Sequence, residues 1–401
     1  MAQPSVPSRP PQSAAPPLGT SSNGSHADFK PAIDRPMGFN GEKTINLGSV
    51  DCIQVLNEQG ELVSIDHDPN LPPAELKRVH RAMVLTRKLD QRMLNMQRQG
   101  EMGTFAPSIG QEATQIGQVY WLKKSDWFAP SYRSFGAQLW RGWPIEQLLL
   151  LWDGFFQGFR PPDGVNDLPM SIVIGSHVAP ATGIAMAARA KKDPSVVVTN
   201  FGDGALSQGI VAESFNFAAV YKSPVIFVCE NNGFAISVPV EKQAGITELA
   251  RRGAGFGLPS LRVDGNDILA VIYAMKSAVD RARTGEGPSF IECVTYRMSY
   301  HTTADDPKVY RNEEEVERWK ARCPIARFEK YLASQKIMTA QEISAVADEC
   351  EQQVLAAREV FRKNAVADPR EIFDFVYADL PADLQNQKDE YLARLARKGV
   401  K

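Results

Sequence analysis

The sequence predicts an α/β protein in which a mainly parallel sheet is flanked by helices, with an extended N-terminal arm and a helical C-terminal region. Apolar runs at residues 195–201 and 224–229 have the character of buried parallel strands, and residues 288–296 form a further strand. Helical patterns at residues 206–221 and 267–284 separate them. We expect an arm at residues 1–40, an α/β domain at 41–320 and a helical region at 321–401.

Composition limits the classes of partner. The 401 residues carry a net charge of -2, which gives no electrostatic reason to expect nucleic acid or an anionic membrane surface. No apolar run approaches the roughly 20 residues of a membrane helix, so we expect a soluble protein. The five cysteines lack CxxC spacing, which favours free thiols, and Cys229 and Cys293 fall in predicted strands as core residues.

Residues 1–40 are rich in Pro, Ser and Gly and too poor in large apolar residues to form a core. A mitochondrial presequence would be rich in arginine, whereas this arm has only Arg9 before Arg35. We therefore expect a flexible arm on a bacterial cytoplasmic protein, with location in a mitochondrial matrix left open.

Helices are predicted along the first half of the chain. Residues 73–99 form a long amphipathic helix that starts at a proline, and residues 111–122, 143–156 and 178–192 form three more. His177 precedes the last of these and is interpreted as a capping or packing residue.

An aromatic residue and a cation stand together on the irregular segment at residues 127–133. Arg133 follows Tyr132, and a guanidinium offers a fork of donors that suits a phosphate. The structural alternative is a surface arginine beside a packed tyrosine.

The segment from Gly202 to Asn232 is the centre of the predicted chemistry. Asp203, between Gly202 and Gly204, follows one strand, and Asn232 follows the next, so both should lie at the ligand-binding edge of the sheet. One carboxylate, an amide oxygen and a loop carbonyl such as that of Phe234 are too few for a protein-only magnesium site. A magnesium diphosphate is the ligand that this set implies. A bare Gly-Asp-Gly would more often be only a strand-end turn.

Residues 296–307 leave a predicted strand and are polar, so we expect a loop there. His301 is the best acid/base candidate among the five histidines, because an unperturbed imidazole titrates near neutral pH. The alternative is an exposed loop histidine without a role.

Together, residues 75–390 resemble the alpha subunit of a 2-oxo acid dehydrogenase, the thiamin-dependent decarboxylating component of a multienzyme complex. The resemblance is carried by residues 131–133, 202–204, 215–219, 231–237 and 262–267 and by the loop of His301. It is closest to bacterial pyruvate dehydrogenase alpha subunits, with branched-chain (2-oxoisovalerate) dehydrogenase alpha subunits next. Residues 164–169, and Glu230 where some branched-chain relatives carry arginine, favour pyruvate.

The resemblance implies a thiamin diphosphate-binding fold with defined residue roles. Asp203, Asn232 and the Phe234 carbonyl would bind magnesium, and His301 would be the catalytic residue. Ile174 would support the bent cofactor, and the Ile172 carbonyl would meet its aminopyrimidine. The implied cofactor-binding set is Tyr132, Arg133, Ile172, Ile174, Asp203, Gly204, Ala205, Asn232 and His301.

The resemblance also implies partners. A separate beta subunit would supply the glutamate that activates the cofactor, giving an α2β2 heterotetramer. The acyl group would pass to a lipoyl domain of a dihydrolipoyl acyltransferase, whose core organises the complex.

Three alternatives remain. An acetoin dehydrogenase alpha subunit would share the cofactor chemistry, as would a branched-chain enzyme. A nicotinamide-dependent oxidoreductase is disfavoured because residues 253–257 lack the GxGxxG spacing. A non-catalytic scaffold is disfavoured by intact Asp203, Asn232 and His301.

Overall fold

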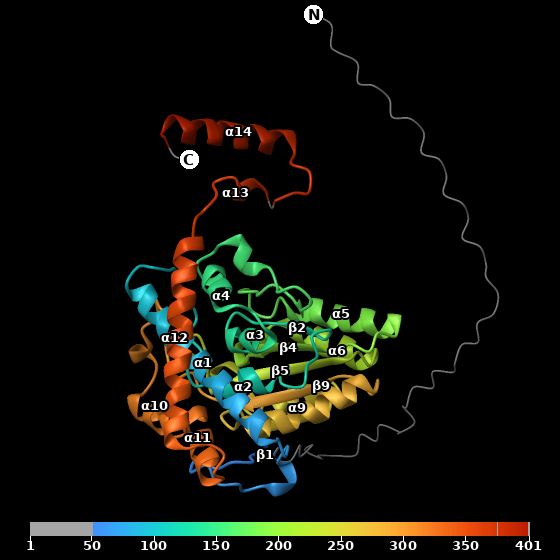
Figure 1. Cartoon of the computed structure of the whole chain (residues 1–401). Coiled ribbons are helices and arrows are strands. Elements are labelled where there is room, and N and C mark those ends of the chain that lie inside the picture. The colour runs from blue at the N-terminus through green and yellow to red at the C-terminus, as the bar shows by residue number, and fades with distance from the viewer. Residues whose placement is uncertain (1–50, 375, 400–401) are drawn as a thin grey trace, which may run out of the picture. The chain divides into compact units, whose positions relative to one another are not determined.

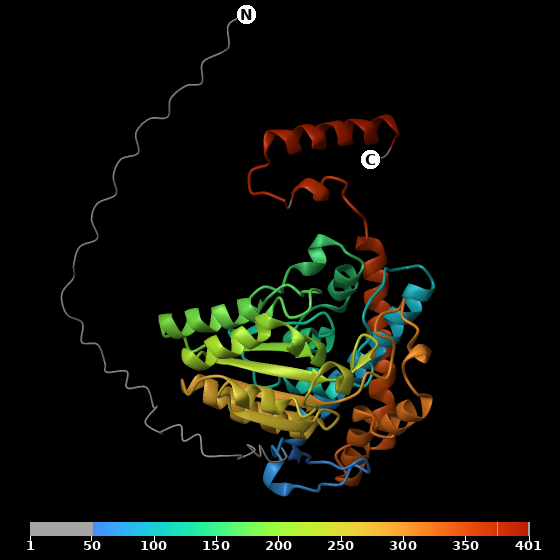
Figure 2. The ribbon, with the colours of Figure 1, turned by 180° about the vertical axis from the view of Figure 1, so that it is seen from behind.

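The computed structural model describes residues 51–374 and 376–399, shown in Figure 1 and, from behind, in Figure 2. The arm predicted at residues 1–40 lies outside the described residues. None of the described helices combines the length and apolar character needed to cross a membrane.

Seven strands form one sheet in the order β1-β8-β9-β5-β4-β2-β3, and every neighbouring pair is parallel. The predicted mainly parallel sheet is therefore confirmed. The strands are β1 (Cys52–Ile53), β2 (Trp127–Ala129), β3 (Asn166–Asp167), β4 (Val197–Gly202), β5 (Val225–Asn231), β8 (Ser260–Asp264) and β9 (Ser289–Val294). A separate antiparallel pair consists of β6 (Phe234–Ala235) and β7 (Val238–Pro239).

Helices account for most of the rest of the described chain. The helices before and between the central strands are α1 (Pro73–Arg98), α2 (Glu112–Gly117), α3 (Phe135–Arg141), α4 (Ile145–Trp152), α5 (Val178–Lys191), α6 (Gly209–Val220), α7 (Val240–Gln243), α8 (Ala250–Gly255) and α9 (Ile268–Arg283). The C-terminal helices are α10 (Glu313–Lys320), α11 (Pro324–Ser334), α12 (Ala340–Asn364), α13 (Glu371–Asp374) and α14 (Ala382–Arg397). Four 3-10 turns are η1 (Ile65–His67), η2 (Phe156–Phe159), η3 (Asp203–Ser207) and η4 (Pro307–Val309).

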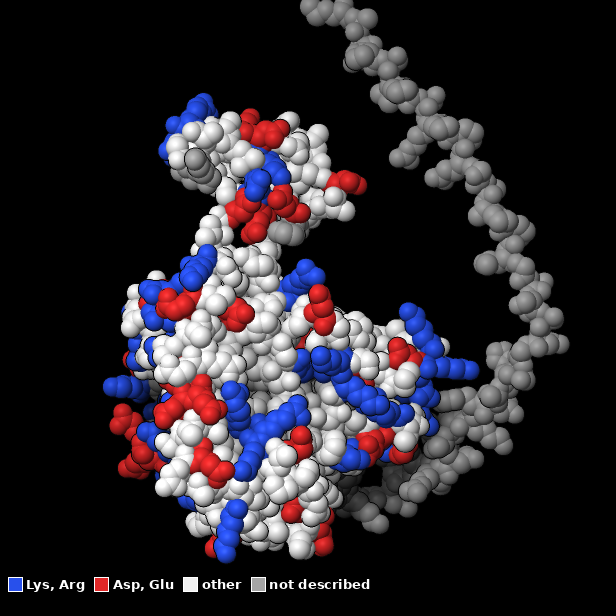
Figure 3. Space-filling view, in the orientation of Figure 1, with Lys and Arg blue, Asp and Glu red and all other residues white. Residues whose placement is uncertain are grey.

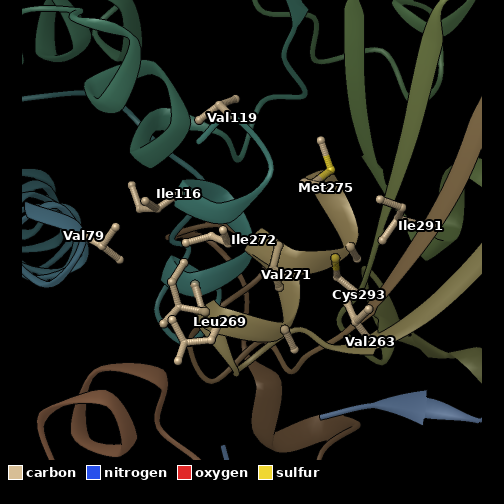
Figure 4. Close-up of a cluster of buried hydrophobic side chains, with 14 of the residues drawn as sticks. Val79, Ile116, Val119, Val263, Leu269, Val271, Ile272, Met275, Ile291 and Cys293 are labelled. Carbon is tan, nitrogen blue, oxygen red and sulfur yellow. The ribbon is translucent and has the colours of Figure 1, made fainter. Parts of the chain in front are cut away.

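Alternate residues of the central strands face two different layers of helices. On β5, Ile226 and Val228 pack into a core with α1, α2 and α9, part of which is shown in Figure 4. Phe227 and Cys229 pack on the opposite face with α5 and α6. The sheet is covered on both faces, which explains why β4 and β5 are continuous apolar runs in the sequence. Cys229 and Cys293 are buried strand residues, as predicted.

A third core joins α1 to α4 and to α12 through residues such as Leu89, Leu149 and Val354. The long helix α12 begins with a capping box. The Thr339 hydroxyl accepts from the Glu342 N–H at 3.2 Å, and the Glu342 carboxylate accepts from the Thr339 N–H at 2.7 Å. The predicted helical C-terminal region is thus confirmed.

Some element boundaries differ from the prediction. The helix expected at residues 111–122 is α-helical only over α2, and the helix expected from residue 206 begins at α6, after the turn η3. The loop expected after residue 296 is confirmed, because β9 ends at Val294 and no helix or strand follows in the described residues until η4. The start of this loop is nevertheless part of the core, since Tyr296 and Arg297 are each only 1% exposed. The face of the molecule in Figure 3 carries basic and acidic side chains close to one another.

Candidate active site

Asp203 and Asn232 directly follow the neighbouring strands β4 and β5. Parallel strands end at the same edge of a sheet, and there both residues line one cavity of about 200 Å³. The predicted meeting of these two residues is confirmed.

Most of the predicted site residues line this cavity. They are Tyr132, Arg133, Ile174, Asp203, Gly204, Ala205, Asn232, Phe234 and His301. Ile172 does not line the cavity and is 65% exposed. The cofactor contacts assigned to these residues, and to Ile172, stay predictions.

The two glycines beside Asp203 do not adopt a left-handed backbone conformation. Neither Gly202 nor Gly204 has a positive φ. A Cβ atom on Gly204 would lie 2.9 Å from Cβ of Ala235, which is too close for two carbon atoms. Gly204 is therefore needed for close packing against β6.

Asp203 has a buried carboxylate without a hydrogen-bond partner. The residue is fully buried, and neither carboxylate oxygen forms a hydrogen bond with the described residues. Burial raises the pKa of Asp203 to about 6, despite the opposing influence of nearby backbone and of Arg297 and Arg133. A buried charge is stable only when it is paired, so this carboxylate suits a bound cation.

The protein side chains alone do not complete a metal site. Within residues 51–374 and 376–399, no group of three or more His, Cys, Asp or Glu side chains is placed to hold a metal ion. Asn232 Oδ1 accepts from the Phe234 N–H at 3.3 Å, and Asn232 Nδ2 donates to Gln111 Oε1 at 3.3 Å. The Phe234 carbonyl accepts from Arg297 Nη1 at 3.3 Å, a contact that its sequence assignment to magnesium did not include.

Two buried guanidinium groups line the same cavity as the Asp203 carboxylate. Arg133 is 5% exposed and Arg297 is 1% exposed. Arg133 donates to the carbonyls of Pro107 and His301. Arg297 donates to the Ile236 carbonyl and to the Tyr310 hydroxyl. Among the described residues, every hydrogen-bond acceptor of these two guanidiniums is a neutral group, so the pair suits an anion such as a phosphate.

His301 lies between these two guanidiniums. Its Nδ1 is 3.3 Å from Arg133 Nη2 and 3.3 Å from Arg297 Nη1. A guanidinium can only donate, so Nδ1 is the acceptor and the hydrogen of the neutral ring is on Nε2. Burial and the charges of Arg133 and Arg297 lower the pKa of His301 to about 4. The expected titration near neutral pH is therefore wrong, and at pH 7 the ring is a neutral donor.

Three buried glutamines on α2 and at its two caps form hydrogen bonds with residues of the site or near it. Gln111 contacts Asn232, Gln115 Oε1 accepts from the Gly136 N–H at 2.7 Å, and Gln118 Nε2 donates to Glu230 at 3.0 Å. These glutamines recur at helical spacing on a buried helix, so they act as polar support rather than as solvent-facing residues. Burial raises the pKa of Glu230 to about 7, against the hydrogen bonds from Asn200 and Gln118.

His177 also lines the cavity. Its Nε2 donates to the Asn200 carbonyl at 2.7 Å, and its side chain does not cap α5. Burial lowers its pKa, so the ring is neutral and fixed in one tautomer. This fits the packing option of the sequence interpretation and not the capping option.

Arg297 was not singled out from the sequence. It comes shortly after β9, and β9 lies next to β5, so the strand-end rule that identified Asp203 also applies to it. Residues 297–307 are polar, so nothing in the sequence indicated that Arg297 is buried.

Comparisons with known proteins identify the family of this chain. Residues 80–369 match the family described as the dehydrogenase E1 component. The pyruvate dehydrogenase E1 component subunit alpha of Acholeplasma laidlawii is 40% identical over 351 residues, which cover 86% of this chain and 100% of that protein. The 3-methyl-2-oxobutanoate dehydrogenase subunit alpha of Mycobacterium tuberculosis is 42% identical over 336 residues, 82% of this chain and 89% of that protein. The pyruvate dehydrogenase E1 component subunit alpha of Staphylococcus aureus is 38% identical over 356 residues, 88% of this chain and 96% of that protein. The chain therefore belongs to the dehydrogenase E1 component family of 2-oxo acid dehydrogenases.

Proposed function

We propose that the chain is the alpha subunit of a thiamin diphosphate-dependent dehydrogenase that decarboxylates pyruvate and passes the acyl group to lipoamide. The single observation that carries this proposal is that the unpaired, buried Asp203 carboxylate lines the same cavity as two buried guanidiniums. That pattern matches a ligand with a cation at one end and an anion beside it. Thiamin diphosphate is the cofactor that the family implies.

Magnesium is part of the proposal. Asp203 and the Asn232 amide oxygen would hold the ion, with the Phe234 carbonyl shared between the ion and Arg297. Arg133 and Arg297 would neutralise the diphosphate, and the His301 Nε2 hydrogen would donate to it or to the substrate carboxylate. When bound, thiamin diphosphate supplies the electron sink for the electron pair that is released as carbon dioxide leaves a 2-oxo acid.

A beta subunit is needed to complete this site. The two carboxylates that line the cavity are Asp203, which is assigned to the magnesium ion, and Glu230, whose Oε1 accepts from Gln118 and Asn200. Neither is free to activate the cofactor. The exposed apolar side chains of Ile210, Phe217 and Val220 on α6, together with Tyr221 directly after it, give a partner a surface to cover.

We further propose that a lipoyl domain of a dihydrolipoyl acyltransferase reaches the cavity past the exposed side chains of Ile172 and Val173. The enzyme would then be an α2β2 component of a multienzyme complex in a bacterial cytoplasm. Purified chain without a beta subunit should decarboxylate neither pyruvate nor 3-methyl-2-oxobutanoate, and addition of the beta subunit should restore turnover. Full activity of the chain alone would overturn the partner proposal.

The substrate is tested by the ratio of kcat/KM for pyruvate to that for 3-methyl-2-oxobutanoate. The assay uses the chain co-purified with its beta subunit, magnesium, thiamin diphosphate and an artificial electron acceptor. The second acid is the competing candidate because the Mycobacterium tuberculosis relative carries its name at 42% identity. A ratio well above one supports pyruvate, and a ratio below one assigns the chain to branched-chain acids.

A further inference from the structure

Glu230 stands at the end of β5 and lines the cavity, yet its carboxylate is directed at two neutral amides. The side chain is buried, with an exposed fraction of 3%. Its Oε1 accepts from Asn200 Nδ2 at 2.7 Å and from Gln118 Nε2 at 3.0 Å. The carboxylate forms no ion pair with the described residues, so its contacts hold an amide in place.

Asn200, on β4, links this carboxylate to the turn that follows β2, the next strand of the sheet. Its Oδ1 accepts from the Ser131 N–H at 2.9 Å and from the Ser134 hydroxyl at 3.0 Å. Its Nδ2 donates to Glu230 and also to the Ser134 hydroxyl at 2.8 Å. A hydroxyl can donate or accept, so the orientation of the amide is selected by Glu230 and by the Ser131 N–H. Loss of Glu230 would leave the amide free to rotate and to present N–H groups to the Ser131 N–H.

The turn held by Asn200 carries Tyr132 and Arg133 between its two serines. The hydroxyls of Ser131 and Ser134 are 3.1 Å apart, which closes the turn. Arg133 leaves this turn to reach the Pro107 and His301 carbonyls. The orientation of Asn200 therefore determines where the guanidinium stands in the cavity.

We propose that Glu230 is a positioning residue that acts through Asn200 to place Arg133 against the diphosphate of the cofactor. This inference rests on the proposed function, because it assumes that Arg133 meets a diphosphate. It gives a role to Glu230, which stands where some branched-chain relatives carry arginine. In this proposal Glu230 does not contact the cofactor, and it acts only by fixing the position of Arg133.

The test measures the dissociation constant of magnesium thiamin diphosphate by isothermal titration calorimetry. It uses the full-length chain co-purified with its beta subunit. Glu230→Ala should raise the dissociation constant by about tenfold or more, because the Arg133 turn loses its fixed position. Glu230→Gln should raise it by less than about threefold, because a Gln Oε1 still accepts from Gln118 and Asn200.

A double-mutant cycle separates positioning from direct binding. In an Arg133→Ala background, Glu230→Ala should weaken binding by less than about threefold further, because the group through which it acts is absent. Ser134→Ala is a milder variant that also loosens the turn, and it should raise the dissociation constant by about threefold. Asp126→Ala is the matched control. It removes a buried carboxylate that holds the Val196 N–H and Arg283 at the start of β4, so it should lower Tm and leave the dissociation constant unchanged.

Three results would overturn the inference. They are a wild-type dissociation constant in both Glu230→Ala and Ser134→Ala, equal effects of Glu230→Ala and Glu230→Gln, and fully multiplicative effects of Glu230→Ala and Arg133→Ala. If the wild-type complex itself fails to bind magnesium thiamin diphosphate, the proposed function fails as well, which distinguishes the two.

Discussion

Replacement of Asp203 with asparagine should make the ligand-free chain more stable relative to the wild type as the pH rises. The same replacement should remove the cation site. The substitution keeps the size of the side chain and removes its charge. Because the folded-state pKa of Asp203 is raised, the folded chain holds this proton more tightly than the unfolded chain does. The free energy of unfolding of the wild type therefore falls as the pH rises through this range.

The size of the effect follows from the two pKa values. The carboxyl group titrates at 3.8 when it is unperturbed and at about 6 in the folded chain. A difference of roughly two units corresponds to about 3 kcal/mol of stability lost between low pH and neutral pH. Between about pH 4.5 and 7.5 the wild type should lose about 2 kcal/mol relative to the Asp203→Asn variant. The cost of burying an amide is the same at both pH values and cancels in this comparison.

The assay is urea unfolding followed by the fluorescence of the six tryptophans, at the two pH values and in the presence of EDTA. A difference between variant and wild type that is the same at both pH values would refute the reasoning. It would mean that Asp203 titrates as a solvated or paired carboxyl group. With magnesium thiamin diphosphate at about 100 times its dissociation constant, the wild type should instead gain about 2.7 kcal/mol, and the variant should gain nothing.

Three further predictions follow from the same cavity and its supporting loop. The imidazole of His301 should stay neutral down to about pH 4 in NMR titrations of the ligand-free chain, and its pKa should rise when a diphosphate balances the two guanidiniums; a pKa near 6.5 without ligand would contradict this. Gly110→Ala should lower the free energy of unfolding by about 1–3 kcal/mol in urea titrations, because Gly110 has a φ of 101° and its Cβ would lie 2.7 Å from the Tyr296 carbonyl oxygen. Gly142→Ala, with a φ of 100° and open space around it, is the control for backbone strain, and equal losses in both variants would show that the contact with Tyr296 does not matter. Removal of magnesium by EDTA should weaken thiamin diphosphate binding by about tenfold or more in calorimetry and excess magnesium should restore it, whereas equal affinity in EDTA would exclude a metal at Asp203.

The sequence predicted the parts of the site that depend on local pattern and on sheet geometry. Asp203 and Asn232 could be placed together because each follows an apolar run, and parallel strands share their carboxyl edge. Arg133 could be selected because an arginine beside a tyrosine on an irregular segment already suggests a phosphate contact. These inferences need only residues close in the chain and one rule about sheets.

The sequence could not predict properties that arise from distant segments. His301 looked like a group that titrates near neutral pH, but its pKa depends on Arg133, which is 168 residues away along the chain. Arg297 looked solvent-exposed until Phe234 and Ile236 supplied carbonyls from β6 and the turn after it. In the sequence, Glu230 was notable only because some branched-chain relatives carry arginine at its position. Its hydrogen bond with Asn200 depends on the pairing of β4 with β5, which the sequence alone does not show.

The order of the strands has a consequence for the synthesis of this protein. The cavity is built from residues between positions 131 and 301, and β1, made early, pairs with β8, made more than 200 residues later. When Asp203 and Asn232 have emerged from the ribosome, Arg297 and His301 have not yet been exposed. Until then β5 lacks β9 as its neighbour, and its apolar residues are not yet covered on that side. A ligand of this cavity can therefore stabilise the subunit only after the chain up to His301 has left the ribosome, so its binding acts on nearly finished chains and not on their synthesis.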